Sequence, residues 1–388
     1  MPEVTFTDPR GVAIDIPFNR PGQVGNEIRY IQTALESAHI SGDGTFSRLC
    51  HEFLEREIEV PKALLTTSCT DALEMSAMLL NLKPGDEVIV PAFTFVSCVN
   101  AIALRGARPV FADVRPDTLN IDETAIEKLI TSSTRAIMVV HYAGVGCEMD
   151  TISQLAAAHG LAVIEDNAHG LFGTFRGRQL GTFGSLATLS FHETKNFTCG
   201  EGGALLINDQ ALIEPAEIVR EKGTNRSQFF RGQVDKYTWC GLGSSHLPSD
   251  ILAAYLLAQL QARSEIQAKR QSVWENYSTA LDAWAQRSEV RLPFVPAHCT
   301  QPYHMFYMLM PSLDLRQKFI GALRDQGIQA VFHYQPLHIS PMGRRFGGRV
   351  GDCPITEEIS DRLVRLPFYN DLTETDQTRV VDAVTAFA

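Results

Sequence analysis

The feature that most constrains the fold is an alternation of apolar and helical segments between about residues 60 and 210. Six segments are almost continuously apolar, which is typical of strands covered on both faces of a sheet: 86–93, 108–114, 135–144, 161–170, 187–193 and 204–209. One intervening helix is well marked, because Asp150 can cap its start and Gly160 can end it. Strands that alternate with helices predict an α/β fold with a mainly parallel sheet.

The pattern changes at about residue 251. The sequence then predicts one long helix over 251–284, which could be bent, and a strand over 305–310. A helix over 315–326, a second strand over 330–338 and a last helix from 374 follow. This is typical of a smaller α+β unit. We therefore predict an N-terminal extension over 1–25, a large α/β domain over 26–250 and a smaller C-terminal domain over 251–388.

Charge and composition exclude several classes of function. The net charge of −11 argues against general binding to nucleic acid or to anionic membranes, although it leaves room for a small anionic ligand in a local basic pocket. The sequence has no run of about 18 apolar residues and no secretory signal, so we expect no membrane span and a cytoplasmic location. The eight cysteines form no C-x-x-C pair, which disfavours a zinc site or a disulfide framework.

Ligands of open α/β sheets bind outside the carboxyl ends of the strands, so we expect the functional residues there. Ser68, Cys69 and Thr70 follow an apolar run and open a helical segment. Their hydroxyl groups and the free backbone N–H groups of the helix could hold a phosphate, which the helix dipole would favour. Plain N-capping by Ser68 or Thr70 is the alternative.

Three further residues follow predicted strands. Phe95 could stack on a planar ligand or pack as a core aromatic. Asp166, with His169 beside it, could cap a helix or pair with a buried cation. The ring of Phe95 and the carboxylate of Asp166 are thus expected at the same edge of the sheet.

Lys195 lies between a predicted buried strand and the glycine-rich turn 200–203. A lysine in such a place is a candidate for forming a Schiff base. Its free pKa of about 10.4 would have to be lowered by burial or by a nearby cation before the amine could act as a nucleophile or base. A solvated lysine in a turn is the alternative. The sequence contains neither the G-x-G-x-x-G fingerprint of a dinucleotide site nor a P-loop.

These four features, in this order, suit pyridoxal 5′-phosphate. Its phosphate needs an anion site, its ring an aromatic side chain to stack on, its pyridine nitrogen a carboxylate and its aldehyde a lysine. The segments that contain these residues, with those around 68–75 and 91–97, resemble the DegT/DnrJ/EryC1/StrS group. These are fold-type-I, pyridoxal-phosphate-dependent nucleotide-sugar aminotransferases. The resemblance covers the chain from about Ile16 to its end and implies a seven-stranded, mainly parallel sheet.

The resemblance implies a role for individual residues. Lys195 matches the Schiff-base lysine, Asp166 the partner of the pyridine nitrogen, and Phe95 the stacking aromatic. The phosphate-binding positions are matched by Ser190, Thr70 and Asp71, the last two through their backbone N–H groups. The sequence departs from the group at two positions. His169 stands where glutamine is frequent, and Ser245 or a neighbour stands where an asparagine reaches the phosphate of the neighbouring subunit.

The resemblance also implies the substrates and the assembly. The amino donor would be L-glutamate and the acceptor a nucleotide sugar, and four segments narrow the resemblance to members that aminate dTDP-4-dehydro-6-deoxyglucose at C4. We expect a homodimer with shared active sites. Candidate substrate-binding residues lie in a basic, aromatic loop and near residue 335: Lys222, Arg226, Arg231, Lys236, Tyr334 and His338. The alternatives are a solvated loop and ordinary packing of Tyr334 and His338.

Overall fold

The computed structural model describes residues 13–387. Its centre is a seven-stranded sheet in the order β1-β9-β8-β5-β4-β2-β3, in which only β9 runs antiparallel to its neighbours. The strands are β1 (Lys62–Thr66), β2 (Glu87–Pro91), β3 (Arg108–Ala112), β4 (Thr134–Val140), β5 (Ala162–Asp166), β8 (Leu186–Ser190) and β9 (Gly203–Ile207). The predicted α/β class, with its mainly parallel sheet, is confirmed.

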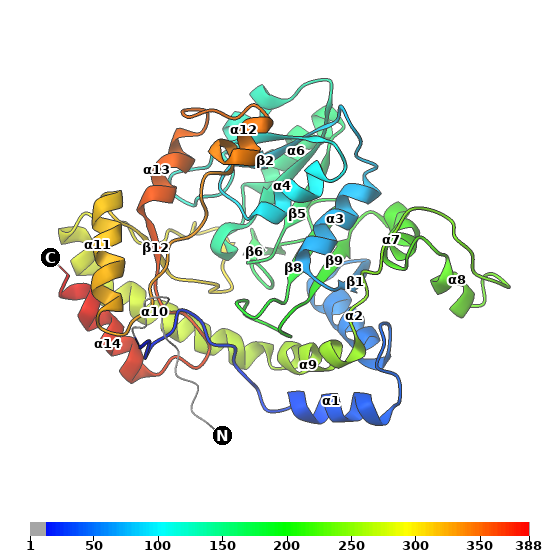
Figure 1. Cartoon of the computed structure of the whole chain (residues 1–388), viewed down its shortest axis with the longest axis horizontal. Coiled ribbons are helices and arrows are strands. Elements are labelled where there is room, and N and C mark those ends of the chain that lie inside the picture. Colours follow the sequence, from blue (N-terminus) through cyan, green and yellow to red (C-terminus); the bar gives the residue numbers. More distant parts are fainter. Residues whose placement is uncertain (1–12, 388) are drawn as a thin grey trace.

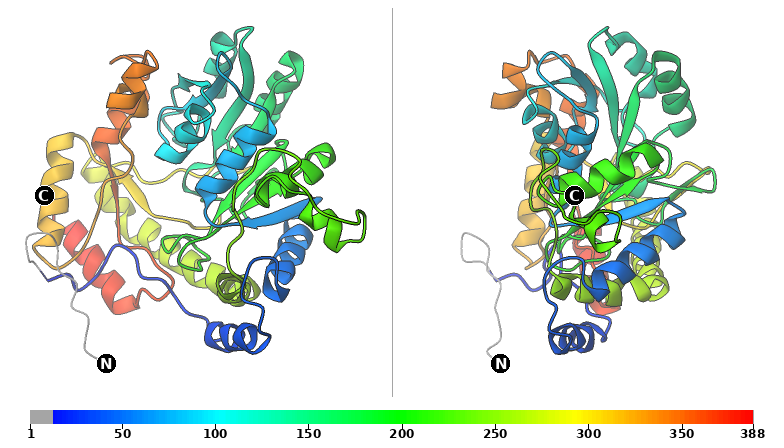
Figure 2. Two further views of the ribbon diagram at one scale, coloured as in Figure 1. Left: turned by 45° about the vertical axis from the view of Figure 1, so that its right-hand side comes forward. Right: turned by 90° about the vertical axis from the view of Figure 1, so that its right-hand side faces the viewer.

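Helices cover both faces of this sheet (Figures 1 and 2). Side chains alternate along a strand, so Val88 and Val90 of β2 pack with α3 and α4, whereas Ile89 packs with α6 on the other face. The covering helices are α2 (Thr45–Ile58), α3 (Cys69–Leu79), α4 (Val96–Ala103), α6 (Met149–His159), α7 (Ile213–Arg220) and α9 (Asp250–Gln261), and α1 (Glu27–Glu36) packs on the outer side of α9. This double burial is the reason for the almost continuous apolar runs of the sequence.

The predicted helix before β5 exists as α6, but its first residues differ from the expectation. Glu148, not Asp150, occupies the N-cap position, and no side chain caps the helix there. Asp150 lies in the first turn, where its carboxylate faces the positive end of the helix dipole and pairs with Arg176 at 3.0 Å. Gly160 ends the helix in the left-handed conformation, as predicted.

The C-terminal third contains the predicted helices and one strand that replaces a predicted one. The long helix is divided at Ala262 into α9 and α10 (Arg263–Arg287), and the later elements are α11 (Leu313–Arg324), β11 (Tyr307–Leu309), α12 (Pro341–Arg345), α13 (Pro354–Arg362), β12 (Leu363–Arg365) and α14 (Glu374–Thr385). The predicted strand 330–338 is wrong. Only Val331 forms a bridge there, and Pro336, which has no N–H to donate, is followed by the short 3-10 helix Leu337–Ile339. Instead, β12 pairs with β11.

The remaining elements are short and lie in connections. They are β6 (Thr174–Phe175), β7 (Arg178–Gln179), β10 (Cys299–Thr300), α5 (Glu123–Ile126), α8 (Arg226–Phe230) and three 3-10 turns at Glu127–Leu129, Tyr142–Gly144 and Gln210–Leu212. In the part of the chain that the structure describes, no helix combines the length and apolarity needed to cross a bilayer.

The beginning of the described chain packs on its end. Ile16 is fully buried in the hydrophobic cluster of α10, α11 and α14, and it forms a parallel bridge with Ile328. Residues 1–12 of the predicted extension lie outside the described residues. Several residues of α9 belong to the cluster that also contains β8 and β9 side chains, such as Leu257 and Leu189. The division into two domains at residue 250 stays a prediction.

Candidate active site at the carboxyl edge of the sheet

The candidate residues of the sequence converge where the parallel strands end. Asp166 is the last residue of β5 and Ser190 the last residue of β8. Phe95 follows β2 and precedes α4, and Ser68 lies between β1 and α3. In Figure 1 the labels β2, β5, β8, α3 and α4 mark these neighbouring elements. Because the strands share one direction, residues far apart in sequence come to one edge of the sheet.

The N-terminus of α3 has the donors that an anion needs. Ser68 is the N-cap, and its hydroxyl accepts the backbone N–H of Asp71 at 3.0 Å. Within the described residues, the backbone N–H groups of Cys69 and Thr70 and the hydroxyl of Ser190 make no hydrogen bond. A phosphate would find these groups together with the positive end of the helix dipole. N-capping by Ser68 and an anion site therefore coexist.

Gly203 allows β9 to pass directly behind this helix start. A Cβ atom at Gly203 would lie 2.4 Å from the backbone nitrogen of Cys69 and 2.4 Å from the carbonyl carbon of Ser68. No other residue type can approach a backbone so closely. The close packing of Gly203 against Ser68 and Cys69 thus fixes the position of the backbone N–H of Cys69. Gly200, by contrast, lies at an open turn with a φ of +86°.

Asp71 is held away from the anion site by its own partners. Its carboxylate accepts hydrogen bonds from Thr67 and Ser68, and its Oδ1 lies 3.2 Å from Nδ1 of His246. Burial acts to raise the pKa of Asp71, but the hydrogen bonds from His246, Thr67 and Ser68 outweigh it, and the pKa is lowered. Since Ser68 already occupies its N–H, Asp71 offers the predicted phosphate contact only if this cap opens.

Ser245 and Thr70 have different surroundings. Ser245 is exposed, next to His246, and forms an isolated bridge with Glu221. The hydroxyl of Thr70 lies 2.7 Å from that of Ser97, which opens the first turn of α4. Thr70 is therefore available to an anion through its N–H rather than through its side chain.

Asp166 is a buried carboxylate with no cationic partner among the described residues. Its Oδ2 accepts the thiol of Cys98 at 2.9 Å, and its Oδ1 accepts the N–H of Ala168 at 3.0 Å. The chain continues from Asp166 into turns, not into a helix, so the helix-capping alternative does not apply. A buried carboxylate without a cation is unfavourable, and a protonated ring nitrogen would supply the missing charge.

Lys195 lies in the turn after β8, and its amine has no hydrogen bond or ion pair with any described residue. Lys195 is half-buried. Burial lowers the pKa of Lys195, and the cation of Arg365 lowers it further, while Cys69 and Asp166 act in the opposite direction. A lysine with a lowered pKa does not fit the solvated alternative.

Aromatic rings line the approach to these groups. Phe95 is 54% exposed, which is unusual for a phenylalanine and contradicts the core alternative, and its ring centroid lies 6.3 Å from that of Tyr334. His169 is buried and stacks on His304 at 4.2 Å. The Nε2 of His169 lies 3.4 Å from the hydroxyl of Tyr334, and its buried Nδ1 has no described partner. Burial lowers the pKa of His169, so the ring is neutral at pH 7.

The structure does not bring His338 to this site. Its side chain is fully buried, and its Nε2 lies 2.9 Å from Oε1 of Glu357. Tyr334, by contrast, contacts both Phe95 and His169. The two residues are four positions apart, and the turn at Pro336 directs them differently.

Most basic residues of the loop form ion pairs with neighbouring carboxylates of the same chain. Lys222 and Arg226 pair with Glu221, and Arg231 pairs with Glu217 at 2.7 Å. Lys236 is exposed. The loop carries α8, which projects from the body of the molecule beyond α7 (Figure 1).

The aromatic residues of this loop contact little of the described chain. Phe230 is 70% exposed and Trp239 is 75% exposed, and Tyr237 is exposed as well. Large aromatic side chains in this position form an apolar surface that is typical of an interface.

Sequence reasoning did not select several residues that complete the site. Cys98 could have been found, because it lies one helical turn after Phe95 and therefore close to the same strand end. Arg365 and His304 gave no such signal. They come from the C-terminal third, and only the packing of that region against the sheet brings them near Lys195 and His169.

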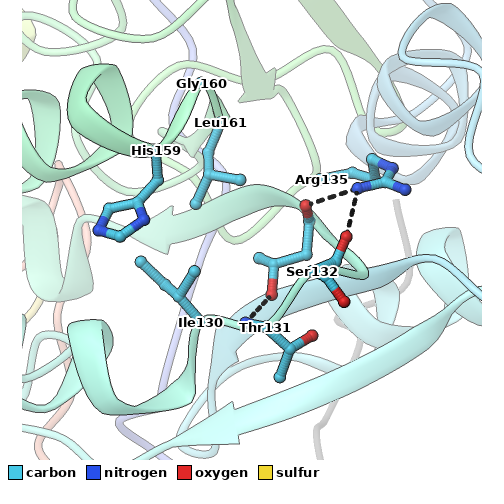
Figure 3. A pocket seen from close by; sticks show the side chains of 8 residues that line it. Ile130, Thr131, Ser132, Arg135, His159, Gly160 and Leu161 are labelled. Carbon is cyan, nitrogen blue, oxygen red and sulfur yellow. Dashed lines mark hydrogen bonds between the residues drawn. The ribbon is translucent and has the colours of Figure 1, made fainter.

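A separate hollow on the surface lies at the opposite edge of the sheet (Figure 3). It is lined by residues before and at the start of β4 and after α6, among them Ser132, Arg135 and His159. Arg135 donates hydrogen bonds to the carbonyl oxygens of Ser132 and Thr134, and it also pairs with Asp86. Its charge is therefore satisfied, and no hydrogen bond or ion pair of the described residues connects the lining of this hollow with Lys195.

Comparison with known proteins identifies the relatives of this chain. A family model described as the DegT/DnrJ/EryC1/StrS aminotransferase family matches residues 22–385. The uncharacterized protein MJ1066 of Methanocaldococcus jannaschii is 35% identical over 377 residues, which are 95% of this chain and 96% of that protein. The spore coat polysaccharide biosynthesis protein SpsC of Bacillus subtilis is 31% identical over 377 residues, with the same coverage. The crystal structure of the aminotransferase TlmJ from Streptoalloteichus hindustanus is similar with a TM-score of 0.87 and 28% identity, covering 96% of this chain and 98% of that one.

Proposed function

The chain belongs to the DegT/DnrJ/EryC1/StrS family of pyridoxal-phosphate-dependent nucleotide-sugar aminotransferases, and we propose that it transfers the amino group of L-glutamate to C4 of dTDP-4-dehydro-6-deoxyglucose. The product would be dTDP-4-amino-4,6-dideoxygalactose, and 2-oxoglutarate would leave. Two observations together carry the transamination chemistry: the amine of Lys195 has no described hydrogen-bond partner and burial lowers its pKa, and the buried carboxylate of Asp166 forms no ion pair among the described residues. The choice of sugar rests on the resemblance of the loop 220–239 and of the segments 114–124, 141–152 and 192–203.

The described residues fit the cofactor group by group. The N–H groups of Cys69 and Thr70 and the hydroxyl of Ser190 would hold the phosphate, and Phe95 would cover one face of the ring. Asp166 would keep the pyridine nitrogen protonated, and the buried Nδ1 of His169 would face the ring oxygen. When bound, pyridoxal phosphate supplies an electron sink for the bonds at the amino-bearing carbon.

The proton transfers would belong to Lys195. Because burial lowers its pKa, the amine is deprotonated in a larger fraction of molecules than an exposed lysine would be. In the first half-reaction it would take the proton from the α-carbon of L-glutamate, and in the second it would deliver a proton to C4 of the sugar. The face of C4 that Lys195 reaches would decide between the galacto and gluco products.

The absorbance of the purified protein tests this proposal. We expect a visible band from bound cofactor that changes when L-glutamate is added and returns when the correct keto sugar follows. Assays with several 4-keto and 3-keto nucleotide sugars would then identify the acceptor. A protein without the band, or a band that L-glutamate leaves unchanged, would contradict the function. A response to L-glutamate with a preference for another sugar would contradict only the proposed acceptor.

We further propose that the protein is a homodimer in which the basic loop reaches the neighbouring active site. Within one chain, the loop projects away from the body and leaves Phe230 and Trp239 exposed. In a dimer these aromatic residues could be buried, and Arg231 could exchange Glu217 for the diphosphate of the partner's nucleotide sugar. Two-fold dimers are the commonest oligomers.

The substitution Arg231→Glu is expected to weaken nucleotide-sugar binding roughly 10-fold or more and to leave the half-reaction with L-glutamate unchanged. The reason is that only the sugar substrate carries a diphosphate. Initial rates at varied sugar concentration and the absorbance change with L-glutamate measure the two effects separately. Equal losses in both would contradict a specific role in binding the diphosphate.

Mixed dimers give the stronger test of site sharing. Chains with Lys195→Ala are expected to be inactive, and chains with Arg231→Glu are expected to have low activity at a sugar concentration well below their KM, at which the assay is run. A mixed dimer would contain one site with both intact residues, so part of the activity should return. A fully active monomer in sedimentation, or no recovery in confirmed mixed dimers, would overturn the shared site.

The location and the domain division are proposals of the same kind. The change in pattern near residue 251 supports a large domain followed by a smaller one, although α9 contributes to the core of the sheet region.

A further inference from the structure

Arg365 is the last residue of β12 and has a rigid backbone. It pairs with Tyr307 of β11, and its N–H and carbonyl groups both bond to Val331, at 2.7 Å and 3.1 Å. Directly paired residues of antiparallel strands have side chains on the same face. The side chain of Arg365 therefore lies on the face of Tyr307, whose ring contacts that of Tyr142 at 5.7 Å.

The guanidinium of Arg365 lacks a carboxylate. One nitrogen donates to the carbonyl oxygen of Phe332 at 3.0 Å, and the group lies 4.5 Å above the ring of Phe18. Its Nε is buried and makes no hydrogen bond, and no carboxylate of the described residues lies within ion-pair distance. Arg362, three residues earlier, is instead bonded to Glu358 and to a carbonyl oxygen. Arg365 as a whole is half-buried, and a partly desolvated guanidinium, which stays charged at neutral pH, favours an anion as its partner.

Two paths of contacts place this cation near the reacting centre. Phe18, under the guanidinium, is followed by Asn19, whose amide donates to the carbonyl oxygen of Glu193 in the turn that contains Lys195. On the other side, Tyr142 connects Tyr307 to His169, with ring centroids 5.9 Å apart. The charge of Arg365 is also among the causes that lower the pKa values of Lys195 and His169.

We propose that Arg365 binds the α-carboxylate of the amino donor. This inference rests on the proposed function and adds the residue that recognises the donor. In an amino acid the carboxylate carbon is two bonds from the reacting nitrogen, or about 2.5 Å from it. An anion-binding residue close to Lys195 therefore meets the α-carboxylate first. The sugar is uncharged around C4, and its diphosphate lies beyond the ring, which suits the exposed loop rather than Arg365.

The competing explanation is that Arg365 is structural and only holds the carbonyl oxygen of Phe332. That role would use one of the five N–H groups of the guanidinium. It would not distinguish amino-donor substrates with an α-carboxylate from those without one. Substitution would then change stability but not the selectivity for amino donors.

The test compares Arg365→Lys and Arg365→Met with Arg362→Lys as the matched control. The dissociation constant of α-methyl-L-glutamate, which cannot lose an α-proton, is measured by calorimetry on holoenzyme. We expect it to rise about 10-fold for Arg365→Lys, which keeps the charge but loses the two-pronged geometry, and about 100-fold for Arg365→Met. Arg362→Lys should match the wild type.

A second measurement asks which carboxylate is bound. L-Glutamate is compared with its α-amide and its γ-amide in the half-reaction followed by absorbance. Wild type should discriminate strongly against the α-amide, and Arg365→Met should lose this discrimination by a factor of at least 10. If Arg365→Met does not fold, Arg365→Lys carries the same comparison, with a smaller loss.

The outcomes separate this inference from the proposed function. No response of wild-type holoenzyme to L-glutamate contradicts the function itself and removes the basis of the inference. A normal wild-type response, with variants whose donor binding stays within twofold, overturns only the role of Arg365. Selective weakening of nucleotide-sugar binding in the Arg365 variants would overturn it as well, because it would assign the cation to the other substrate.

Discussion

Lys195→Ala is expected to lower transamination by at least about 10³-fold, because the amine serves both as the group that holds the cofactor aldehyde and as the proton carrier. The amine has no partner among the described residues, so its removal breaks no hydrogen bond. It also removes the unfavourable burial of a charge, and we expect a melting temperature equal to or above that of the wild type. Turnover and thermal unfolding measure the two expectations on the same sample.

Lys195→Arg is the control for this experiment. It keeps a cation in the same place, but a guanidinium does not give up its proton at neutral pH, so activity should be lost as in the alanine variant. Retention of most of the turnover in either variant would remove Lys195 from the mechanism. His169 is buried and His333 is half-buried, and desolvation lowers the pKa values of both, so these neutral rings would be the next candidates for moving the proton.

Asp166→Asn is expected to lower turnover by roughly 10- to 200-fold, which corresponds to the loss of a charge-assisted contact of about 1.5–3 kcal/mol. The neutral amide has the shape of the carboxylate but cannot keep the pyridine nitrogen protonated. Its oxygen can still accept from the Cys98 thiol or from the N–H of Ala168, so the fold should remain. Steady-state kinetics with both substrates measure the loss.

Asp150→Asn is a matched control, because Asp150 is an exposed carboxylate near the start of α6 whose described ion pair is with Arg176 and not with a residue of the candidate site. Its activity should equal that of the wild type. An Asp166→Asn enzyme within twofold of wild type would show that the carboxylate only orders the turn through Ala168. A protein that loses its cofactor band in this variant but regains activity with excess cofactor would indicate a role in binding.

The strand ends were predictable because local pattern and topology agree there. Buried strands need apolar residues on both faces, so their limits appear directly in the sequence, as for β5 and β8. Parallel strands then bring Asp166 and Ser190 to the same edge without further information. The strand expected at 330–338 failed because its apolar residues pack in an irregular segment, where Pro336 removes the N–H that a ladder would need.

The sequence by itself determined the fold class and which residues follow the carboxyl ends of the strands, since both depend on local patterning and on short motifs. Only the tertiary structure decided which alternative each residue follows. Phe95 is exposed, Asp166 begins a turn, His338 is paired with Glu357, and Arg365 has no carboxylate. These outcomes depend on contacts between segments that are distant along the chain. Burial, charge compensation and pKa arise from such contacts, and no local pattern records them.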